Sequence, residues 1–489
     1  MNSIFALPLI IFFIVMFFIA LWARSRVNDA EDFIVAGRGL SLWLLMATLI
    51  ATWFGAGSLS VSADMVREEG LRVTALEPLG VGVCLILAGL IYAKPMWEAK
   101  VLTLADVIRQ RFGPTAELLQ VIYSISYFGW IAVQLMAIAN IIHTVFGFDV
   151  SVSLILITAL LTVYTLLGGM WSVALTDAVQ VSLLILGLIL LTANVLSAVG
   201  DGSVLIGFEN LFQQADRAYM TWLPTEKLSE FNYWLGLFLV GALGSIASQD
   251  LMQRIFAAES AQVAVRACVG SGVVYLLIAS LPVLLGLAAN ILLPEVTQGV
   301  VPALVEQFLS PTMAIILMLT LTAAITSTVD SALLGPASTF AQNLLRHRVS
   351  SRVSTLSLTR YAIVFVALAS VSLALSGTAA IDLLQSSFAL GIPPLVILTF
   401  AIYQKTTYAL PAVVTSVLGL CVWTYDLITM LFLEAHGMES VDAFLPMPLL
   451  MLVLSVVVYL SVYCWVHFRH PDRATFTKTP LPAKTPSPT

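Results

Sequence analysis

Hydroxyl-bearing residues gather in one apolar stretch, 312–342, where they are suited to coordinate a cation. Ala324, Ser327, Thr328 and Ser331 fall at i, i+3, i+4 and i+7, so they share one face of a helix. Asp330 lies in the same stretch, and a carboxylate within an apolar span costs at least about 2.5 kcal/mol, so it calls for a partner. The alternative for each hydroxyl is a bond back to its own helix.

A second carboxylate, Asp177, stands in the motif GGMWSVALTDAVQ at the start of another apolar stretch. Two carboxylates, several hydroxyls and the free carbonyls of a helix break form a set of hard oxygen ligands, which suits Na+ better than a soft metal. Neither Asp177 nor Asp330 has a Lys or Arg within its own apolar stretch. We therefore expect a cation or a shared proton to be their partner.

Two apolar stretches are interrupted by small residues. Gly55, Ala56 and Gly57 sit within 41–63 beside several serines, and Gly241 to Gly244 sit within 232–248. Freed backbone groups in hydrocarbon cost several kcal/mol each, so irregular backbone survives there only where it is buried in protein or lines a polar cavity. The interruptions predict a binding site, with close helix packing through small residues as the alternative.

The composition defines the class of protein to which these residues belong. Of the 489 residues, 60% are hydrophobic and only 10% are charged, and the mean hydropathy is +0.99. This predicts an all-α polytopic membrane protein. The net charge of -6 argues against a nucleic-acid partner. The N-terminal apolar run has no positive residue ahead of it and no cleavage site, so we expect a first membrane helix rather than a signal peptide.

Thirteen apolar stretches predict thirteen transmembrane helices, near 4–22, 41–63, 75–92, 116–146, 151–167, 174–198, 232–248, 268–291, 312–342, 356–375, 381–402, 408–432 and 447–467. An odd number places the termini on opposite sides of the membrane. The intervening stretches divide the 22 Lys and Arg residues into 18 on one side and four on the other, namely Arg67, Arg72, Arg217 and Lys227. The positive-inside rule then places the N-terminus outside and the C-terminus in the cytoplasm.

The second to sixth and the seventh to eleventh predicted helices form two sets of five. Because five is odd, the second set is inverted relative to the first, and an interrupted helix heads each set. Corresponding broken helices in inverted repeats indicate the midplane site of a secondary transporter. The predicted organisation is a first helix and loop (1–40), a ten-helix transport core (41–407), two peripheral helices (408–468) and a disordered cytoplasmic tail (469–489).

Four motifs resemble those of the sodium:solute symporter family: FIVAGRGLS, LGGMWSVALTDAVQ, QDLMQR and ITSTVDSALLGPASTFAQNL. The resemblance implies a LeuT-type fold of two inverted five-helix repeats with extra helices. It also implies a main Na+ site at the carbonyls of Ala51 and Phe54 with Ala324, Ser327 and Thr328. A second ion site, present only in some members of the family, would use Asp177, Asp330 and Ser331.

Within that family the chain is most similar to the high-affinity choline transporter branch, through IATWFGAGS, LAGLIYAKPM, YTLLGGMWSVALTD and STVDSALL. The resemblance places Trp53 and Trp130 at tryptophans of the choline pocket. Ser248 and Val81 stand where that branch has Trp and Tyr, so the aromatic cage is half present. The expected substrate-binding residues are Trp53, Gly55, Gly57, Trp130, Gln134 and Ser248.

Glu77, near the outer end of the third predicted helix, is a candidate counter-charge for a cationic solute. The alternative is an ion pair at the membrane interface. Trp130 and Gln134 stand four residues apart and so share a helix face. Two aromatic faces and an amide at midplane depth predict a compartment for a compact polar or cationic solute.

We expect a Na+-coupled symporter in the cell membrane that imports a small organic solute, choline or another quaternary amine being the first candidate. The alternatives are a symporter of an amino acid, another zwitterion or a carboxylate, and a membrane sensor of the same fold. A sensor would need an appended domain, for which the tail is short. For an enzyme we find neither a nucleophile with its base nor a metal cluster. The expected partners are the solute and membrane lipid, and the sequence indicates no oligomeric state.

Overall fold

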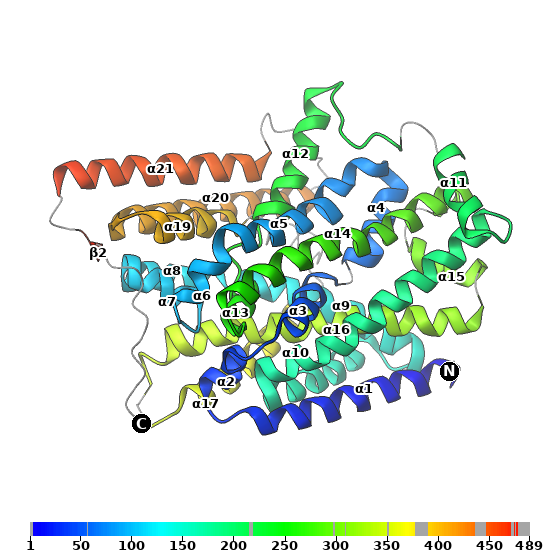
Figure 1. Cartoon of the computed structure of the whole chain (residues 1–489), viewed down its shortest axis with the longest axis horizontal. Coiled ribbons are helices and arrows are strands. Elements are labelled where there is room, and N and C mark those ends of the chain that lie inside the picture. Colours follow the sequence, from blue (N-terminus) through cyan, green and yellow to red (C-terminus); the bar gives the residue numbers. More distant parts are fainter. Residues whose placement is uncertain are drawn as a thin grey trace.

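The computed structural model is almost wholly helical and describes residues 3–55, 57–214, 219–296, 299–308, 310–349, 352–376, 390–435, 446–470, 474 and 476–477. The long helices run roughly side by side, with α1 (Ser3–Ala23) along one edge and α21 (Met447–Arg469) along the other (Figure 1). Many apolar side chains of these two helices face outward, including Leu7, Phe18 and Phe468. Exposed apolar surfaces of this kind are expected where a protein contacts membrane lipid.

The first predicted interruption is a real break in the helix. α3 (Leu42–Trp53) ends where Phe54 leaves the helical conformation, with φ -87° and ψ 83°. The chain resumes in the π turn η3 (Gly57–Val61) and continues as α4 (Ser62–Glu69). The N–H of Gly55 donates to the carbonyl of Trp53 at 3.2 Å, whereas in a continuous helix it would donate to that of Ala51. The break therefore frees the carbonyl of Ala51.

The second predicted interruption is also a break. α12 (Leu228–Leu243) ends in a turn, closed by the Ser248 N–H donating to the Ser245 carbonyl at 3.2 Å, and α13 (Gln249–Ala257) follows. A short connection then leads to α14 (Ala261–Leu292). Both breaks lie where sequence places small residues, as the low helix propensity of glycine explains.

The sequence predicts two separate helices, 151–167 and 174–198, joined by a loop. In the structure one helix with a sharp bend covers both ranges. α10 (Val150–Val199) is continuous except at Gly169, whose φ of 52° and ψ of -134° are non-helical. A Cβ at Gly169 would lie 2.3 Å from the carbonyl oxygen of Phe33 in α2 (Ala30–Val35). Only glycine tolerates both this conformation and this close approach.

The helices that could span a membrane differ in length. Among the described residues nine helices are long and apolar enough to span a membrane, and three apolar helices are shorter, namely α3, α12 and α19 (Ile392–Tyr403). α10 contains two of the predicted spans, and the prediction for 381–402 falls partly outside the described residues, as does most of the predicted disordered tail. The count of thirteen therefore stays a prediction.

The other elements complete the chain in order. They are η1 (Arg24–Arg26), η2 (Ala36–Arg38), η4 (Gly70–Ala75), η5 (Leu76–Gly80), α5 (Val81–Leu87), η6 (Ala88–Ala93), α6 (Lys94–Glu98), α7 (Leu104–Phe112), α8 (Pro114–Tyr123), α9 (Ser126–Phe146), α11 (Val204–Gln214), α15 (Val300–Phe308), α16 (Pro311–Thr339), η7 (Phe340–Leu345), α17 (Thr355–Leu375), α20 (Ala409–Ala435) and the antiparallel pair β1 (Thr406–Thr407) and β2 (Phe476–Thr477).

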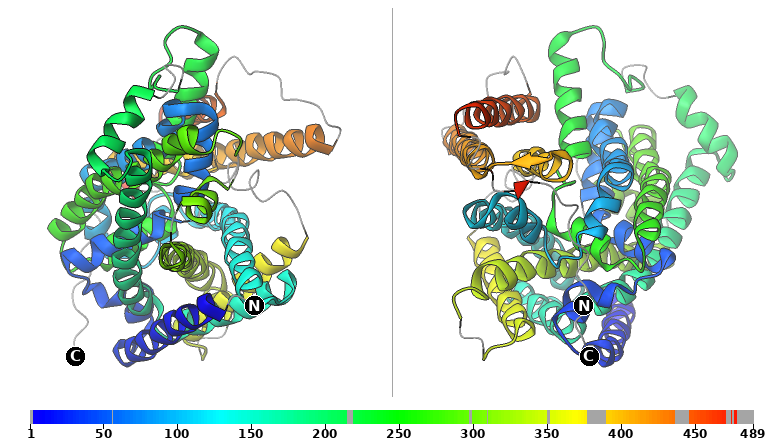
Figure 2. Two further views of the ribbon diagram at one scale, coloured as in Figure 1. Left: turned by 90° about the vertical axis from the view of Figure 1, so that its right-hand side faces the viewer. Right: turned by 60° about the vertical axis from the view of Figure 1, so that its left-hand side comes forward.

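α16 forms the centre of the molecule and is seen nearly end-on in the left view of Figure 2. It packs against α10, α9, α3 and α13. Every residue from 322 to 341 is buried, which covers the whole predicted hydroxyl stripe. The stripe therefore faces other helices on all sides rather than lipid.

Arg254, one of the 18 basic residues that the sequence assigns to the cytoplasmic side, lies elsewhere in the structure. α2, α6, α7 and α13 lie in the left half of Figure 1, and they and their neighbouring loops carry many of these residues. Arg254 of α13, however, is only 1% exposed. It points into the core, so it is a buried charge and not a loop charge.

Candidate functional site

The freed carbonyl of Ala51 meets two hydroxyls of α16. Ser327 Oγ lies 2.9 Å from this oxygen and Thr328 Oγ1 lies 3.5 Å from it. Both hydroxyls also reach the carbonyl of Ala324 in their own helix, at 2.9 and 3.0 Å. Four oxygens from the broken helix and α16 thus converge at one point.

This oxygen set fits a hard cation. The back-bonding foreseen as the alternative does occur, but a hydroxyl has one proton and two lone pairs, so donation to its own helix leaves lone pairs for a cation. The carbonyl of Thr52, 3.3 Å from Thr328 Oγ1, is a further candidate ligand that sequence reasoning missed. Phe54, expected to contribute its carbonyl, lies at the break itself, with its buried ring 5.8 Å from that of Tyr275.

Gly55 joins this oxygen set to the expected solute-binding residues. A Cβ at Gly55 would lie 3.1 Å from Thr328 Oγ1 and 3.2 Å from Gln134 Nε2 of α9. Gln134 is buried, as expected for a polar group at a site within the bundle. The broken helix therefore touches α16 on one side and α9 on another through a single residue.

Gly55→Ala is expected to lower the apparent Na+ affinity of uptake several-fold, because the added methyl displaces Thr328 Oγ1 or the Gln134 amide. Gly57→Ala is the comparison for Na+ dependence alone, because Gly57 is an expected solute-binding residue, but a Cβ there meets nothing of the described structure within 4 Å. Both variants replace a glycine by the same residue in the same break. The Na+ dependence of uptake into proteoliposomes measures the effect, and equal behaviour of the two variants would contradict the close approach at Gly55.

The predicted tryptophans lie on the two helices that meet at Gly55. Trp53 is the last residue of α3, and Trp130 of α9 is partly buried, with its ring 5.8 Å from that of Tyr127. Ser248, expected from the second break, stands directly before α13, and its hydroxyl makes no capping hydrogen bond to that helix. The Tyr127 hydroxyl reaches Asp250, the second residue of α13. Tyr127 thus connects the Trp130 side of α9 with the second break.

Glu77 is held by hydroxyls of the first broken helix. Ser58 Oγ donates to Glu77 Oε1 at 3.0 Å, and Ser62 Oγ lies 3.4 Å from Oε2. Ser58 Oγ also lies 3.1 Å from the Trp53 carbonyl and 3.1 Å from the Tyr275 hydroxyl. No ion pair joins Glu77 to any described residue, so the interfacial ion pair weighed as the alternative is not found there.

Asp177 has a partner that sequence reasoning missed. Arg254 Nη2 lies 3.5 Å from Asp177 Oδ2, and both side chains are buried. We expected a bound cation or a shared proton as the partner of Asp177, because its own stretch holds no Lys or Arg, whereas an arginine of another helix contacts it. The sequence did not indicate this arginine, because Arg254 comes from α13, far along the chain, and follows the second break, where a loop residue was expected.

Arg254 also reaches Ser331, the third residue of the expected second ion site. Its Nη2 lies 2.5 Å from Ser331 Oγ, and its Nε lies 3.1 Å from the Thr48 carbonyl. Thr48 Oγ1 in turn donates to Asp177. The guanidinium thus occupies the middle of the cluster, where the resemblance alone suggested an ion.

Asp330 is separate from this arginine contact. Thr165 Oγ1 of α10 donates to Asp330 Oδ1 at 3.2 Å, whereas Asp330 Oδ2 is buried without a hydrogen-bond partner in the described structure. Asp177 and Asp250 are the buried carboxylates that act on Arg254, and Asp330, also buried, is close enough to Asp177 to be repelled by it. Their excess negative charge calls for protons or a cation, because unpaired charges are costly to bury.

The end of α16 is tied down by Asn343 in η7. Its Nδ2 donates to Asp106 at 2.8 Å and to Glu117 at 2.9 Å, and its Oδ1 accepts from Thr103 at 2.7 Å. Burial raises the pKa of Asp106, whereas the Asn343 bond opposes that change. The network fixes the oxygen-bearing helix against α7 and α8 at this end of the bundle.

Sequence comparison places the chain among transporters. Residues 33–419 match the Sodium:solute symporter family. The human high affinity choline transporter 1 is 30% identical over 362 residues, which cover 69% of this chain and 61% of that protein. The high-affinity choline transporter 1 of Caenorhabditis elegans is 25% identical over 403 residues, 75% of this chain and 68% of that one.

The fold recurs in solved transporters. A Na+-coupled sialic acid symporter in a substrate-bound outward-open state has a TM-score of 0.77 at 18% identity, covering 94% of this chain and 97% of that one. A nucleobase-cation-symport-1 family transporter in a closed conformation has a TM-score of 0.61 at 15% identity, covering 93% and 98%. These likenesses confirm the LeuT-type fold. The match over residues 33–419 shows that this chain belongs to the sodium:solute symporter family.

Proposed function

We propose that this protein is a Na+-coupled symporter that imports a small organic solute across the cell membrane, with choline or another quaternary amine as the first candidate. One observation carries the proposal. The break that frees the Ala51 carbonyl toward Ser327 and Thr328 also brings Gly55 against Gln134. The proposed ion and solute positions therefore share one broken helix.

Shared residues provide the coupling. An ion held by Ala51, Ala324, Ser327 and Thr328 would order the break, so the solute would meet a preformed surface at Trp53 and Gly55. Linkage requires the reverse effect to be equal. Each cation that enters across 100 mV contributes about 2.3 kcal/mol, which can drive the solute against its gradient.

A second cation or a proton is proposed at Asp330. Its Oδ2 has no hydrogen-bond partner among the described residues, whereas Asp177 is engaged by Arg254. This arrangement favours Asp330 over Asp177 as the group that exchanges a proton or ion during transport. Ser331 is the next residue after Asp330 and contacts Arg254, so the exchange would change this contact.

The proposed solute is a cation because Trp53 ends the helix at the first break, Trp130 lies on α9, which meets that break at Gly55, and the Glu77 carboxylate is bonded to Ser58 of the same broken helix. A desolvated cation over an aromatic face gains about 2 kcal/mol. Glu77 is linked to the backbone of Trp53 through Ser58, whose hydroxyl contacts both the Trp53 carbonyl and the Glu77 carboxylate. Val81 and Ser248 leave the aromatic cage incomplete, so an amino acid or another zwitterion is the second candidate.

The proposed domain organisation and membrane orientation follow from the sequence. We propose that residues 41–407 form the transport core, with the N-terminus outside and the C-terminus in the cytoplasm. In the described structure α1 begins at one end of the bundle, and β2, which follows α21, lies at the other (Figure 1). Opposite ends of the bundle are where the two termini must lie if they are on opposite sides of the membrane.

Choline uptake into proteoliposomes under an inward Na+ gradient tests the proposal. Trp53→Ala and Trp130→Ala are each expected to weaken choline affinity about 30-fold, and Trp→Phe variants less. Trp43→Ala is the matched control, because Trp43 is 76% exposed on α3 and should leave affinity unchanged. Glu77→Gln should weaken choline binding and spare that of a neutral solute.

Two outcomes would redirect the proposal. If neither tryptophan variant changes affinity, or if choline and betaine fail to compete for uptake, the quaternary amine is wrong and amino acids should be assayed next. If no solute shows Na+-dependent uptake although the protein is folded, the symport mechanism itself is contradicted.

A further inference from the structure

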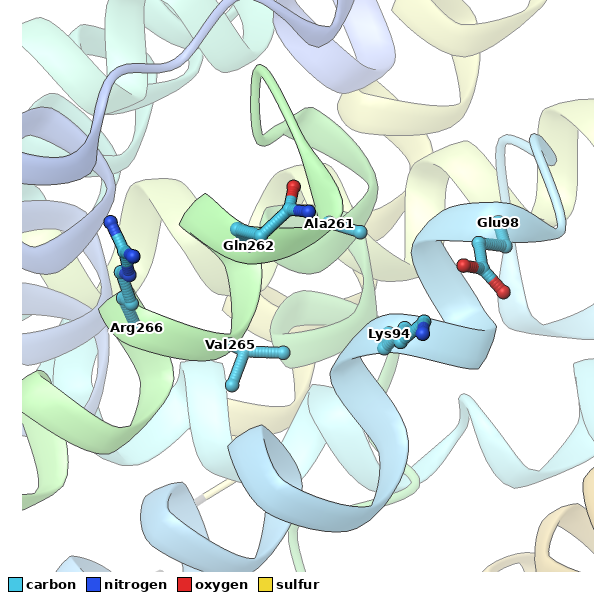
Figure 3. A pocket seen from close by; sticks show the side chains of 6 residues that line it. All are labelled: Lys94, Glu98, Ala261, Gln262, Val265 and Arg266. Atoms are coloured by element: carbon cyan, nitrogen blue, oxygen red, sulfur yellow. The ribbon is translucent and has the colours of Figure 1, made fainter.

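A pocket of about 320 Å³ lies between α6 and the first turns of α14 (Figure 3). Its lining residues are Lys94, Glu98, Ala261, Gln262, Val265 and Arg266. Lys94 begins α6, directly after the apolar η6, and Ala261 begins α14, the helix that holds the predicted span 268–291. The pocket therefore lies where two membrane segments end, and it shares no residue with the proposed ion and solute sites.

The polar side chains of the pocket lack protein partners. Lys94, Glu98, Gln262 and Arg266 are exposed, and none of their side chains has a hydrogen bond or ion pair to another part of the chain that the structure describes. In Figure 3 Arg266 and Glu98 lie at opposite ends of the pocket, with Lys94 nearer to Glu98. Two positive charges and one negative charge are thus arranged in order along one pocket.

The start of α14 adds hydrogen-bond donors on the positive side. Ser260 caps this helix by accepting from the N–H of Val263. Ala261 and Gln262 line the pocket, and their N–H groups have no acceptor among the described residues. Free N–H groups and the helix dipole favour a phosphate at such a position.

Exposed apolar side chains on the same helices indicate that the ligand comes from the membrane. Leu90 of η6, four residues before Lys94, is 65% exposed. Val273 and Leu277 of α14 follow Arg266 at i+7 and i+11, and both are exposed. Apolar surface thus continues from the charged pocket along both helices, as an acyl chain requires.

We propose that this pocket binds the headgroup of an ethanolamine phospholipid. The phosphate lies between Arg266, Lys94 and the first turn of α14, and the ammonium donates to Glu98. A headgroup that carries only negative charge would leave the Glu98 carboxylate without a partner, and the two like charges would repel each other. A trimethylammonium headgroup has no N–H to donate to that carboxylate. The inference rests on the membrane location of the chain and not on which solute it transports.

The test measures lipids retained by the purified full-length protein from bilayers containing equal amounts of ethanolamine, choline and glycerol phospholipids of the same acyl chains, by native mass spectrometry. The wild type should retain the ethanolamine lipid in excess over both others. Lys94→Gln and Arg266→Gln should each lower that retention about fivefold, as expected for about 1 kcal/mol per basic residue. Lys405→Gln, at another exposed lysine, is the matched control and should change nothing.

Glu98→Gln provides the sharpest result. It should abolish the preference for the ethanolamine lipid and raise retention of the anionic glycerol lipid, because the repelling carboxylate is gone. Equal thermal unfolding midpoints would show that each variant is folded. Preference of the wild type for the anionic lipid, or retention independent of Lys94, Glu98 and Arg266, would overturn the proposal, whereas failure of Na+-dependent uptake would leave it standing.

Discussion

Ser327→Ala and Thr328→Val are each expected to raise the Na+ concentration for half-maximal uptake by about tenfold or more. Each removes a hydroxyl oxygen that lies within 3.5 Å of the freed Ala51 carbonyl. Bonds to charged groups are worth about 1.5–3 kcal/mol, and tenfold corresponds to the lower part of that range. Because ion and solute share the break, apparent solute affinity at low Na+ should fall as well.

Thr320→Val is the matched control for this effect. Thr320 is a buried threonine of the same helix, and its hydroxyl donates to the carbonyl of Ile316 in its own helix. The substitution removes the same atom without touching the proposed ion position, so Na+ dependence should not change. Unchanged Na+ dependence in both site variants would mean that the ion binds elsewhere.

Arg254→Gln is expected to destabilise the protein by about 3–5 kcal/mol, because it leaves the buried Asp177 without the only positive side chain that pairs with it among the described residues. Arg254 contacts Asp177, Ser331 and the carbonyls of Thr48 and Asp250. Thermal unfolding in detergent measures the loss. Arg24→Gln, at an exposed arginine, should have no comparable effect.

Two further variants separate pairing from ion binding. Asp177→Asn combined with Arg254→Gln removes both charges of the pair and should recover much of the lost stability. Asp330→Asn removes a carboxylate that has no arginine contact, so it should lower Na+ or H+ coupling while leaving membrane insertion intact. A full loss of folding in Asp330→Asn, or no recovery in the double variant, would contradict these separate roles.

The membrane class, the two helix breaks and the hydroxyl stripe were all predictable because each depends on local sequence. Apolar length defines a membrane segment, and small residues such as Gly55 and Gly57 weaken a helix wherever it lies. Helical periodicity alone puts Ser327, Thr328 and Ser331 on one face. The family motifs added the expectation that this face meets the first break, which the contact with Ala51 agrees with.

The tertiary structure alone decided which groups meet these local features. It placed Arg254 beside Asp177, Ser58 and Ser62 on Glu77, and the Phe33 carbonyl against Gly169. Each contact joins segments from different helices, so neither composition nor helical periodicity encodes it. A buried arginine and a loop arginine look alike in sequence, because burial of a charge depends on whether the packed helices supply its partner.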